Sequence, residues 1–130
     1  MIIYGAGGHA RVIYESLVSS DIVVKAVFDD DRRIEIFKNL EVIHTYNSQY
    51  LRNEKLIIAI GSNETRSTLS AIIKHTFGKL IDPTAFMANS ATIGSGSVIL
   101  ARSIIQVECC IGKHVIVNSG AIVEHNAQVG

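Results

Sequence analysis

A glycine-rich turn near the N-terminus is the first segment able to do chemistry. Residues 5–10 read Gly-Ala-Gly-Gly-His-Ala and directly follow the apolar segment Ile2–Tyr4. This spacing fits the dinucleotide-binding fingerprint, and the acidic residues Asp29 and Asp30 follow about 20 positions further on, as in that fingerprint. Glycines allow a tight strand-to-helix turn, whose free N–H groups and helix dipole attract a phosphate. The turn therefore predicts an anion site.

The length of the segment that contains this turn limits which nucleotide it can bind. The first 80 residues hold only one mononucleotide-binding half, without a second βαβ unit for the nicotinamide side of a dinucleotide. This argues against NAD. An NAD-binding redox or sensing module stays open as an alternative.

Strand and helix patterns alternate up to about Leu80. We expect strands at residues 2–4, 22–28 and 55–60, and helices at 9–19 and after Gly61 with Ser62 or Asn63 as N-cap. This alternation predicts a parallel α/β sheet, whereas residues 34–50 show no clear pattern. The apolar faces of the two helices are expected to hold Val12, Ile13, Leu17, Leu69, Ile72 and Ile73.

From Ile81 onward the alternating strand and helix patterns give way to a strict six-residue repeat of apolar residues. One large aliphatic and one small side chain per six residues suit a short strand followed by a tight corner, and three such units close a triangular coil. Residues 18 apart then stack in three interior ladders. The pattern predicts a parallel β-helix rather than a sandwich, whose strands recur at variable spacings of about 8–12 residues. The aliphatic positions are Ile81, Met87, Ile93, Ile99, Ile105, Ile111, Val117, Val123 and Val129.

The cysteines and three of the histidines have no predicted chemistry. Cys109 falls at a small, inward position of the repeat and is expected in the core, while the adjacent Cys110 cannot form a relaxed disulfide with it. His44 and His75 are expected to be solvated. His114 is expected at a corner of the repeat, as a turn residue or facing a neighbouring subunit.

Composition excludes several classes of partner. The chain has 130 residues, 48% of them apolar, and 12 basic residues balance 12 acidic ones. No basic footprint for nucleic acid is present, and no apolar run approaches the roughly 18 residues of a membrane span. The N-terminus does not read as a signal peptide, and two lone thiols make no metal site. We expect a cytoplasmic protein that uses no metal.

Four segments carry a resemblance to a known family. They are residues 5–10, residues 27–31 (Val-Phe-Asp-Asp-Asp), residues 59–63 (Ala-Ile-Gly-Ser-Asn) with Arg66, and residues 117–125 (Val-Asn-Ser-Gly-Ala-Ile-Val-Glu-His). In this order and spacing, they resemble the bacterial sugar acyltransferases typified by the sialic acid O-acetyltransferases and the UDP-4-amino-sugar N-acetyltransferases. The resemblance implies an α/β mononucleotide-binding domain over residues 1–80, followed by a left-handed parallel β-helix over residues 81–130.

The resemblance also implies the ligands. It indicates a nucleotide sugar with its pyrophosphate at the glycine turn and with Asp29 and Asp30 near the base or ribose, although these two residues could merely end a strand. It further implies acetyl-CoA as co-substrate, a role in surface-glycan synthesis, and a homotrimer whose sites lie between subunits. The residues implied to bind the nucleotide sugar are Gly5, Gly7, Gly8, His9, Arg11, Asp29, Asp30, Gly61, Asn63 and Arg66.

The family's catalytic histidine lies in the pattern Asn-x-x-Ala-x-x-x-His, which Asn118, Ala121 and His125 match. Acyl transfer requires removal of a proton from the attacking amine or hydroxyl, and imidazole titrates near neutrality. The resemblance therefore implies His125 as general base, with Asn118 and Glu124 in the same site, although strand alternation directs Glu124 away from the ring.

Two departures from the family stand out. Asn126 occupies the position where an Asp or Glu commonly follows the histidine, and it can hold a tautomer through its carbonyl but supplies no charge. Val129 and Gly130 open a ninth six-residue unit without a cap, so we expect a fragment or a shortened protein with little acetyl transfer of its own. A non-enzymatic remnant that binds a nucleotide sugar stays open, as do the sugar itself and the choice between N- and O-acetylation.

Overall fold

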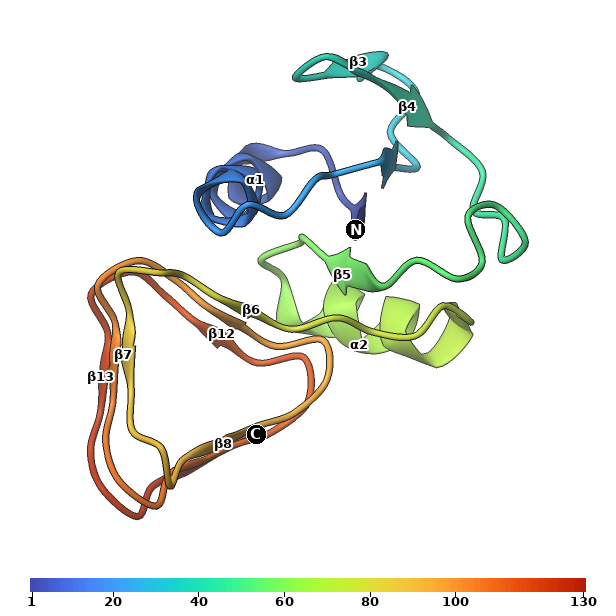
Figure 1. Ribbon diagram of the computed structural model, residues 1–130. Helices are drawn as coiled ribbons and strands as arrows, with labels where there is room; N and C mark the ends of the chain where they lie inside the picture. The colour runs from blue at the N-terminus through green and yellow to red at the C-terminus, as the bar shows by residue number, and fades with distance from the viewer.

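The computed structural model describes residues 1–130 and contains a small α/β sheet followed by a triangular coil (Figure 1). The sheet has the order β3-β4-β2-β1-β5, and only the β3–β4 pair is antiparallel. Its strands are β1 (Ile2–Tyr4), β2 (Ala26–Phe28), β3 (Ile36–Phe37), β4 (Leu40–Ile43) and β5 (Leu56–Ile58). The parallel α/β prediction is confirmed. The second predicted strand is shorter than expected, since residues 22–25 lie outside β2.

Two helices cover opposite faces of this sheet. Helix α1 (Gly8–Ser19) packs on the face that carries Ile3 and Ile57, whereas α2 (Asn63–Ile72) packs on the face that carries Ile2 and Leu56. Side chains alternate along each strand, so both faces of β1 and β5 are buried, as is typical of parallel sheets.

Two residues predicted on the apolar helix faces are exposed instead. Val12 is 45% exposed and Ile72 is 55% exposed, while Ile13, Leu17 and Leu69 are buried. Both outliers lie at the margin of the apolar stripe, where the helix turns away from the sheet. Ser62 is the N-cap of α2, because its Oγ accepts a hydrogen bond from the backbone N–H of Thr65 at 3.3 Å.

The second half forms three parallel sheets, one along each side of the triangle (Figure 1). Every strand pairs with the strand 18 residues away, so that Ile81, Ile99 and Val117 share one ladder. This is the predicted register, and the predicted coil is confirmed. The strands are β6 (Leu80–Ile81), β7 (Phe86–Met87), β8 (Thr92–Ile93), β9 (Val98–Ile99), β10 (Ile104–Ile105), β11 (Cys110–Ile111), β12 (Ile116–Val117), β13 (Ile122–Val123) and β14 (Gln128–Val129).

Burial of the ladders depends on neighbouring coils. Ile99, Ile105 and Ile111 in the middle coil are 0–3% exposed, whereas Ile81 in the first coil is 41% exposed. A solenoid buries each coil against the next, so only a coil with neighbours on both sides is fully covered. Cys109 is also fully buried in this interior, as predicted.

The corners of the coil adopt a left-handed backbone conformation. Six corner positions spaced by six residues have φ between 57° and 78°, and two of them are glycines. The residue after each corner is the small one of the repeat, except for Val115. The side chains of Arg102, Glu108 and Asn126 at these corners are exposed. The six positions are Gly96, Arg102, Glu108, His114, Gly120 and Asn126.

One outer face of the β-helix packs against the α/β sheet. Leu80, Val98 and Leu100 are buried in the same cluster as α1, and the Ser16 hydroxyl donates to an Asp82 carboxylate oxygen at 2.5 Å. The division at residues 80 and 81 stays a prediction. Neither helix in the structure is long and apolar enough to cross a membrane.

Candidate functional site

The glycine turn connects the end of β1 to the start of α1. Gly5 has φ of +119°, and a Cβ there would lie 2.8 Å from the Ala59 carbonyl oxygen, so the position requires glycine. Gly7 is the N-cap of α1, and no side chain caps the helix. The N–H groups of the first helical turn are therefore free for a ligand.

Asp29 holds this turn against the end of β2. One of its carboxylate oxygens accepts from the Ala6 N–H at 2.7 Å and the other from the Asp31 N–H at 2.8 Å. Asp30 accepts from the Tyr4 hydroxyl at 2.8 Å, and burial together with this bond raises the Tyr4 pKa. Both carboxylates thus have structural partners, while Asp29 also borders the cavity described next.

A cavity of about 340 Å³ opens above the turn. His9 lines it, and the Nε2 atom of His9 is buried without a hydrogen-bond partner. Burial, and secondarily the charge of Arg66, lower the His9 pKa and so favour the neutral form of the ring. Free amides and a neutral imidazole suit a phosphate-bearing ligand. The lining residues are Gly5, Gly7, Gly8, His9, Asp29, Asp31, Ile34, Ala59, Ile60 and Gly61.

Arg11 and Arg66 lie outside this cavity. Arg11 is exposed on α1, whereas Arg66 is 7% exposed and ties α2 to the β-helix. Its Nε donates to the His114 carbonyl at 3.1 Å and its Nη1 to the Gly61 carbonyl at 2.8 Å, while Nη2 donates to Asn63 Oδ1 at 2.6 Å. Burial lowers the Arg66 pKa, and no carboxylate pairs with the guanidinium.

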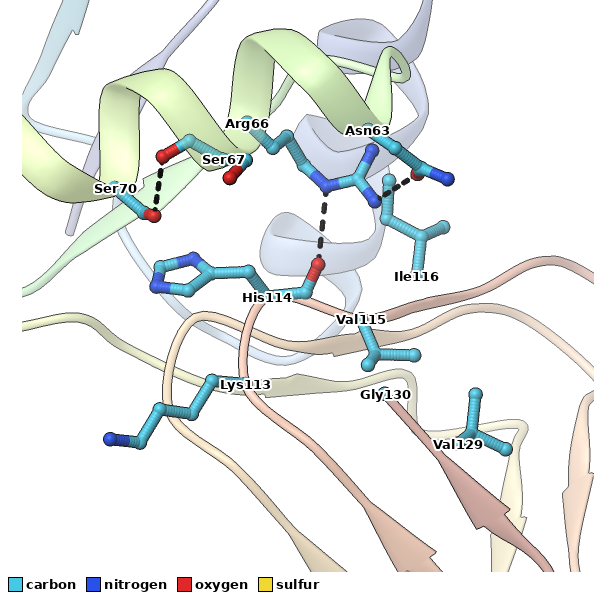
Figure 2. Close-up of a pocket in the computed structure, with 10 residues that line it drawn as sticks. All are labelled: Asn63, Arg66, Ser67, Ser70, Lys113, His114, Val115, Ile116, Val129 and Gly130. Carbon is cyan, nitrogen blue, oxygen red and sulfur yellow. Dashed lines mark hydrogen bonds between the residues drawn. The ribbon is translucent and has the colours of Figure 1, made fainter.

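A second cavity of about 420 Å³ lies between α2 and the β-helix (Figure 2). Arg66 reaches across it to the His114 backbone, as Figure 2 shows. The His114 ring packs edge-on against Phe77, at 4.3 Å between centroids, and therefore faces the chain's own α/β half. Burial, with a smaller contribution from Arg66 and Lys113, lowers the His114 pKa. The lining residues are Asn63, Arg66, Ser67, Ser70, Lys113, His114, Val115, Ile116, Val129 and Gly130.

His125 lies at the corner after β13, far along the chain from the glycine turn. Its side chain is exposed, and its Nδ1 lies 2.8 Å from Asn126 Oδ1. Asn118 is exposed at the preceding corner, where its Oδ1 accepts from the Ser119 N–H at 3.0 Å. Glu124 is exposed, and its carboxylate forms no hydrogen bond.

The prediction that His75 is solvated was wrong. His75 is 4% exposed, with Nδ1 at 2.8 Å from the Tyr46 hydroxyl and Nε2 at 2.9 Å from the Tyr50 carbonyl oxygen. His44 is half-buried, with its Nδ1 at 3.0 Å from the Asp29 carbonyl oxygen. Nothing in the local sequence distinguishes His75 from a surface residue, because its tyrosine partners come from a loop more than 20 positions away.

The sequence profile of the PglD N-terminal domain matches residues 1–73. The chain belongs to this family. It is 36% identical over 108 residues to UDP-N-acetylbacillosamine N-acetyltransferase of Bacillus subtilis, a match that covers 76% of this chain and 50% of that protein. It is also 26% identical over 115 residues to protein L142 of Acanthamoeba polyphaga mimivirus, which covers 86% of this chain and 23% of that protein.

Solved structures extend the PglD-family likeness to the β-helix. PerB from Caulobacter crescentus, in complex with CoA and GDP-perosamine, matches with a TM-score of 0.88 and 29% identity over 98% of this chain and 63% of that chain. The acetyltransferase domain of PglB from Neisseria gonorrhoeae, in complex with acetyl coenzyme A, matches with a TM-score of 0.81 and 29% identity over 98% and 65%. The predicted fold, an α/β domain followed by a left-handed β-helix, and the predicted family resemblance are confirmed.

The PglD-family chain spans at most about two thirds of these relatives, from 23% to 65% of their lengths. Eight of the ten predicted nucleotide-sugar residues line one of the two cavities, whereas Arg11 and Asp30 line neither. The glycines, His9, Asp29 and Gly61 line the turn cavity, and Asn63 and Arg66 line the cavity against the β-helix. The structure adds one carboxylate that the sequence analysis missed, Glu108, which accepts a hydrogen bond from Asn126.

Proposed function

We propose that the protein acetylates the amino group of a nucleotide-activated amino sugar, with acetyl-CoA as the acetyl donor. One observation carries the proposal: 98% of the chain matches the structure of PerB in its complex with CoA and GDP-perosamine, with a TM-score of 0.88. The name of the Bacillus relative supports N-acetylation rather than O-acetylation. The reaction suits surface-glycan synthesis and a cytoplasmic location.

The chemistry assigned to His125 is proton removal. As the sugar amine attacks the thioester carbonyl, a C–N bond forms, the C–S bond breaks, and the amine must lose one proton. His125 Nε2 takes this proton and returns it to the departing thiolate, so atoms and charge balance. The exposed position of His125 leaves Nε2 accessible to two substrates approaching from solvent.

The nucleotide end is assigned to the glycine turn. The free N–H groups of the first turn of α1 and the positive end of the helix dipole stabilise the pyrophosphate. His9 lines the same cavity, so its ring lies beside the bound ligand. Asp29 acts on the ligand indirectly, because both of its oxygens hold the backbone of the turn.

Calorimetry with UDP, UDP-sugars, GDP-sugars and NAD, run side by side on the intact chain, tests the proposed ligand class. We expect a nucleotide sugar to bind and NAD not to bind, because one mononucleotide half has no place for nicotinamide. Tight NAD binding with no response to nucleotide sugars would favour the redox or sensing alternative. Binding of a nucleotide sugar without any acetyl transfer would favour the non-enzymatic alternative.

A homotrimer is the assembly that the outer faces of the β-helix favour. The β6-β9-β12 face is covered by the α/β half, and the β8-β11-β14 face presents Thr92, Cys110 and Gln128. The β7-β10-β13 face instead stacks Phe86, Ile104 and Ile122, of which the first and last are 55% and 59% exposed. This apolar stripe ends at the corner bearing His125, so its burial against a second subunit would bring the base to an intersubunit site.

Replacing Ile122 by glutamate is expected to dissociate the assembly, since it places a charge at the end of the apolar stripe nearest His125. Sedimentation velocity at micromolar concentration measures the change from trimer to monomer. Ile36→Glu is the matched control, because Ile36 is also 59% exposed but lies on β3 of the α/β sheet. A wild-type chain that sediments as a monomer, or equal effects of the two variants, would contradict the stripe as an interface.

A further inference from the structure

Three side chains on two successive coils form one hydrogen-bonded chain. Glu108 Oε2 lies 2.5 Å from Asn126 Nδ2, and Asn126 Oδ1 lies 2.8 Å from His125 Nδ1. Glu108 and Asn126 are 18 positions apart, which is one full turn of the β-helix. The amide of Asn126 therefore connects the imidazole to a carboxylate on the coil beneath it.

The chemistry of the three groups determines where the protons are. An ionised carboxylate only accepts hydrogen bonds, so the NH2 group of Asn126 must face Glu108. Its carbonyl oxygen then faces the ring, and because a carbonyl also only accepts, His125 Nδ1 must carry a hydrogen. The neutral ring consequently keeps its lone pair on Nε2, the atom that the proposed reaction needs as base.

The backbone holds this arrangement in place. Glu108 and Asn126 both occupy left-handed corners, with φ of 60° and 62°, and asparagine is among the residues that adopt this conformation most readily. The Asn126 N–H donates to the Val107 carbonyl at 3.0 Å, and the Glu108 N–H donates to Ser90 Oγ at 3.1 Å. Stacked corners with the same backbone conformation direct the two side chains toward each other.

We propose that Glu108 is a positioning residue that acts through Asn126 to hold His125 in its Nδ1–H tautomer and to supply the negative charge absent at position 126. This rests on the proposed function of His125 as general base. The proposal assigns a role to the one carboxylate connected to the ring, since the neighbouring Glu124 carboxylate forms no hydrogen bond. It predicts that the tautomer depends on a residue 17 positions away from the histidine.

Long-range proton–nitrogen NMR on histidine-labelled protein measures the tautomer without any turnover. We expect the wild-type His125 signals to report a protonated Nδ1 and an unprotonated Nε2, and Glu108→Ala to shift the ring toward the Nε2–H form that free histidine prefers. Glu108→Gln is expected to keep the wild-type tautomer, because a glutamine carbonyl still accepts from Asn126. Glu41→Ala, which removes an exposed carboxylate from β4, is the control and should leave the signals unchanged. A Glu108→Ala spectrum identical to wild type would overturn the proposal.

Kinetics separate this proposal from the proposed function. If both hold, Glu108→Ala lowers kcat by on the order of tenfold, less than loss of the base itself, and leaves KM for the nucleotide sugar unchanged. Glu108→Gln recovers the part of the rate that depends on orientation alone. A changed tautomer with unchanged kcat would retain the hydrogen-bonded chain but contradict His125 as the base. If Glu108→Ala leaves the His125 tautomer unchanged and the protein transfers acetyl groups, only the role of Glu108 is contradicted.

A double-variant cycle tests contact between the two positions. Asn126→Asp places a carboxylate against Glu108, so the two like charges repel, and the gain expected from an acid beside the ring is reduced. Combining Asn126→Asp with Glu108→Gln removes the repulsion, and we expect this double variant to be faster than Asn126→Asp alone. Additive effects of the two substitutions on kcat would show that the side chains do not interact, against the proposal.

Discussion

In a form of the protein that transfers acetyl groups measurably, replacing His125 by alanine is expected to lower kcat by about 10²–10⁴-fold, the range for loss of a positioned general base. The affinity for the nucleotide sugar is expected to stay nearly unchanged, because the turn cavity that would hold the nucleotide is lined by residues of the α/β half only. Steady-state kinetics and calorimetry on the same preparation measure the two quantities.

A control in the same coil guards against a purely structural effect. Gln128 is exposed on β14, three residues beyond His125, and Gln128→Ala should leave kcat within about twofold of wild type because it removes no titratable group. Turnover by His125→Ala close to the wild-type value would remove this residue from the mechanism. Equal losses in both variants would indicate damage to the coil rather than loss of a base.

Replacing Gly7 by valine is expected to weaken nucleotide-sugar binding at least about 100-fold, equivalent to about 2.7 kcal/mol, without unfolding the protein. Gly7 has an extended backbone with φ of −81°, and a Cβ at this position meets no atom within 4 Å. The new side chain therefore fits the fold but occupies the space through which a phosphate reaches the free N–H groups. Calorimetry with the nucleotide sugar identified for the wild type measures the loss.

Gly5→Ala serves as the matched comparison, because a side chain at Gly5 is expected to destabilise the fold, whereas one at Gly7 is not. Its Cβ would meet the Ala59 carbonyl oxygen at 2.8 Å in a backbone conformation with φ of +119°, so thermal unfolding should show a loss of about 1–3 kcal/mol. Gly7→Val should melt near the wild-type temperature. If Gly7→Val binds the nucleotide sugar like the wild type, the ligand site is elsewhere and the turn has only a structural role.

The β-helix could be predicted residue by residue, because its structure is periodic. Each six-residue unit needs the same aliphatic interior side chain and the same short strand. One aliphatic position per six residues was sufficient to assign the interior ladders, and the pairing of Ile81, Ile99 and Val117 follows from the 18-residue period. The glycine turn could also be predicted, since a backbone with positive φ at Gly5 allows few residue types other than glycine. The base candidate, in contrast, came from resemblance, because a lone histidine has no local signature of catalysis.

Other features depended on contacts between distant segments. The burial of His75 comes from Tyr46 and Tyr50 in a loop without regular structure, and the exposure of Ile81 comes from its place in the first coil rather than from its position in the repeat. The short hairpin of β3 and β4 was not predicted, since each strand is too short for a period to show.

The sequence alone determined the two architectures and the residue types able to do chemistry, because local backbone preferences and side-chain periods are properties of neighbouring residues. Only the tertiary structure decided how the polar groups are used. Asp29 holds the turn through backbone N–H groups, Arg66 joins α2 to the β-helix, and Glu108 reaches the ring of His125 through Asn126. A hydrogen bond depends on distances of a few ångströms between atoms, and for residues 18 to 48 positions apart the folded chain alone sets those distances.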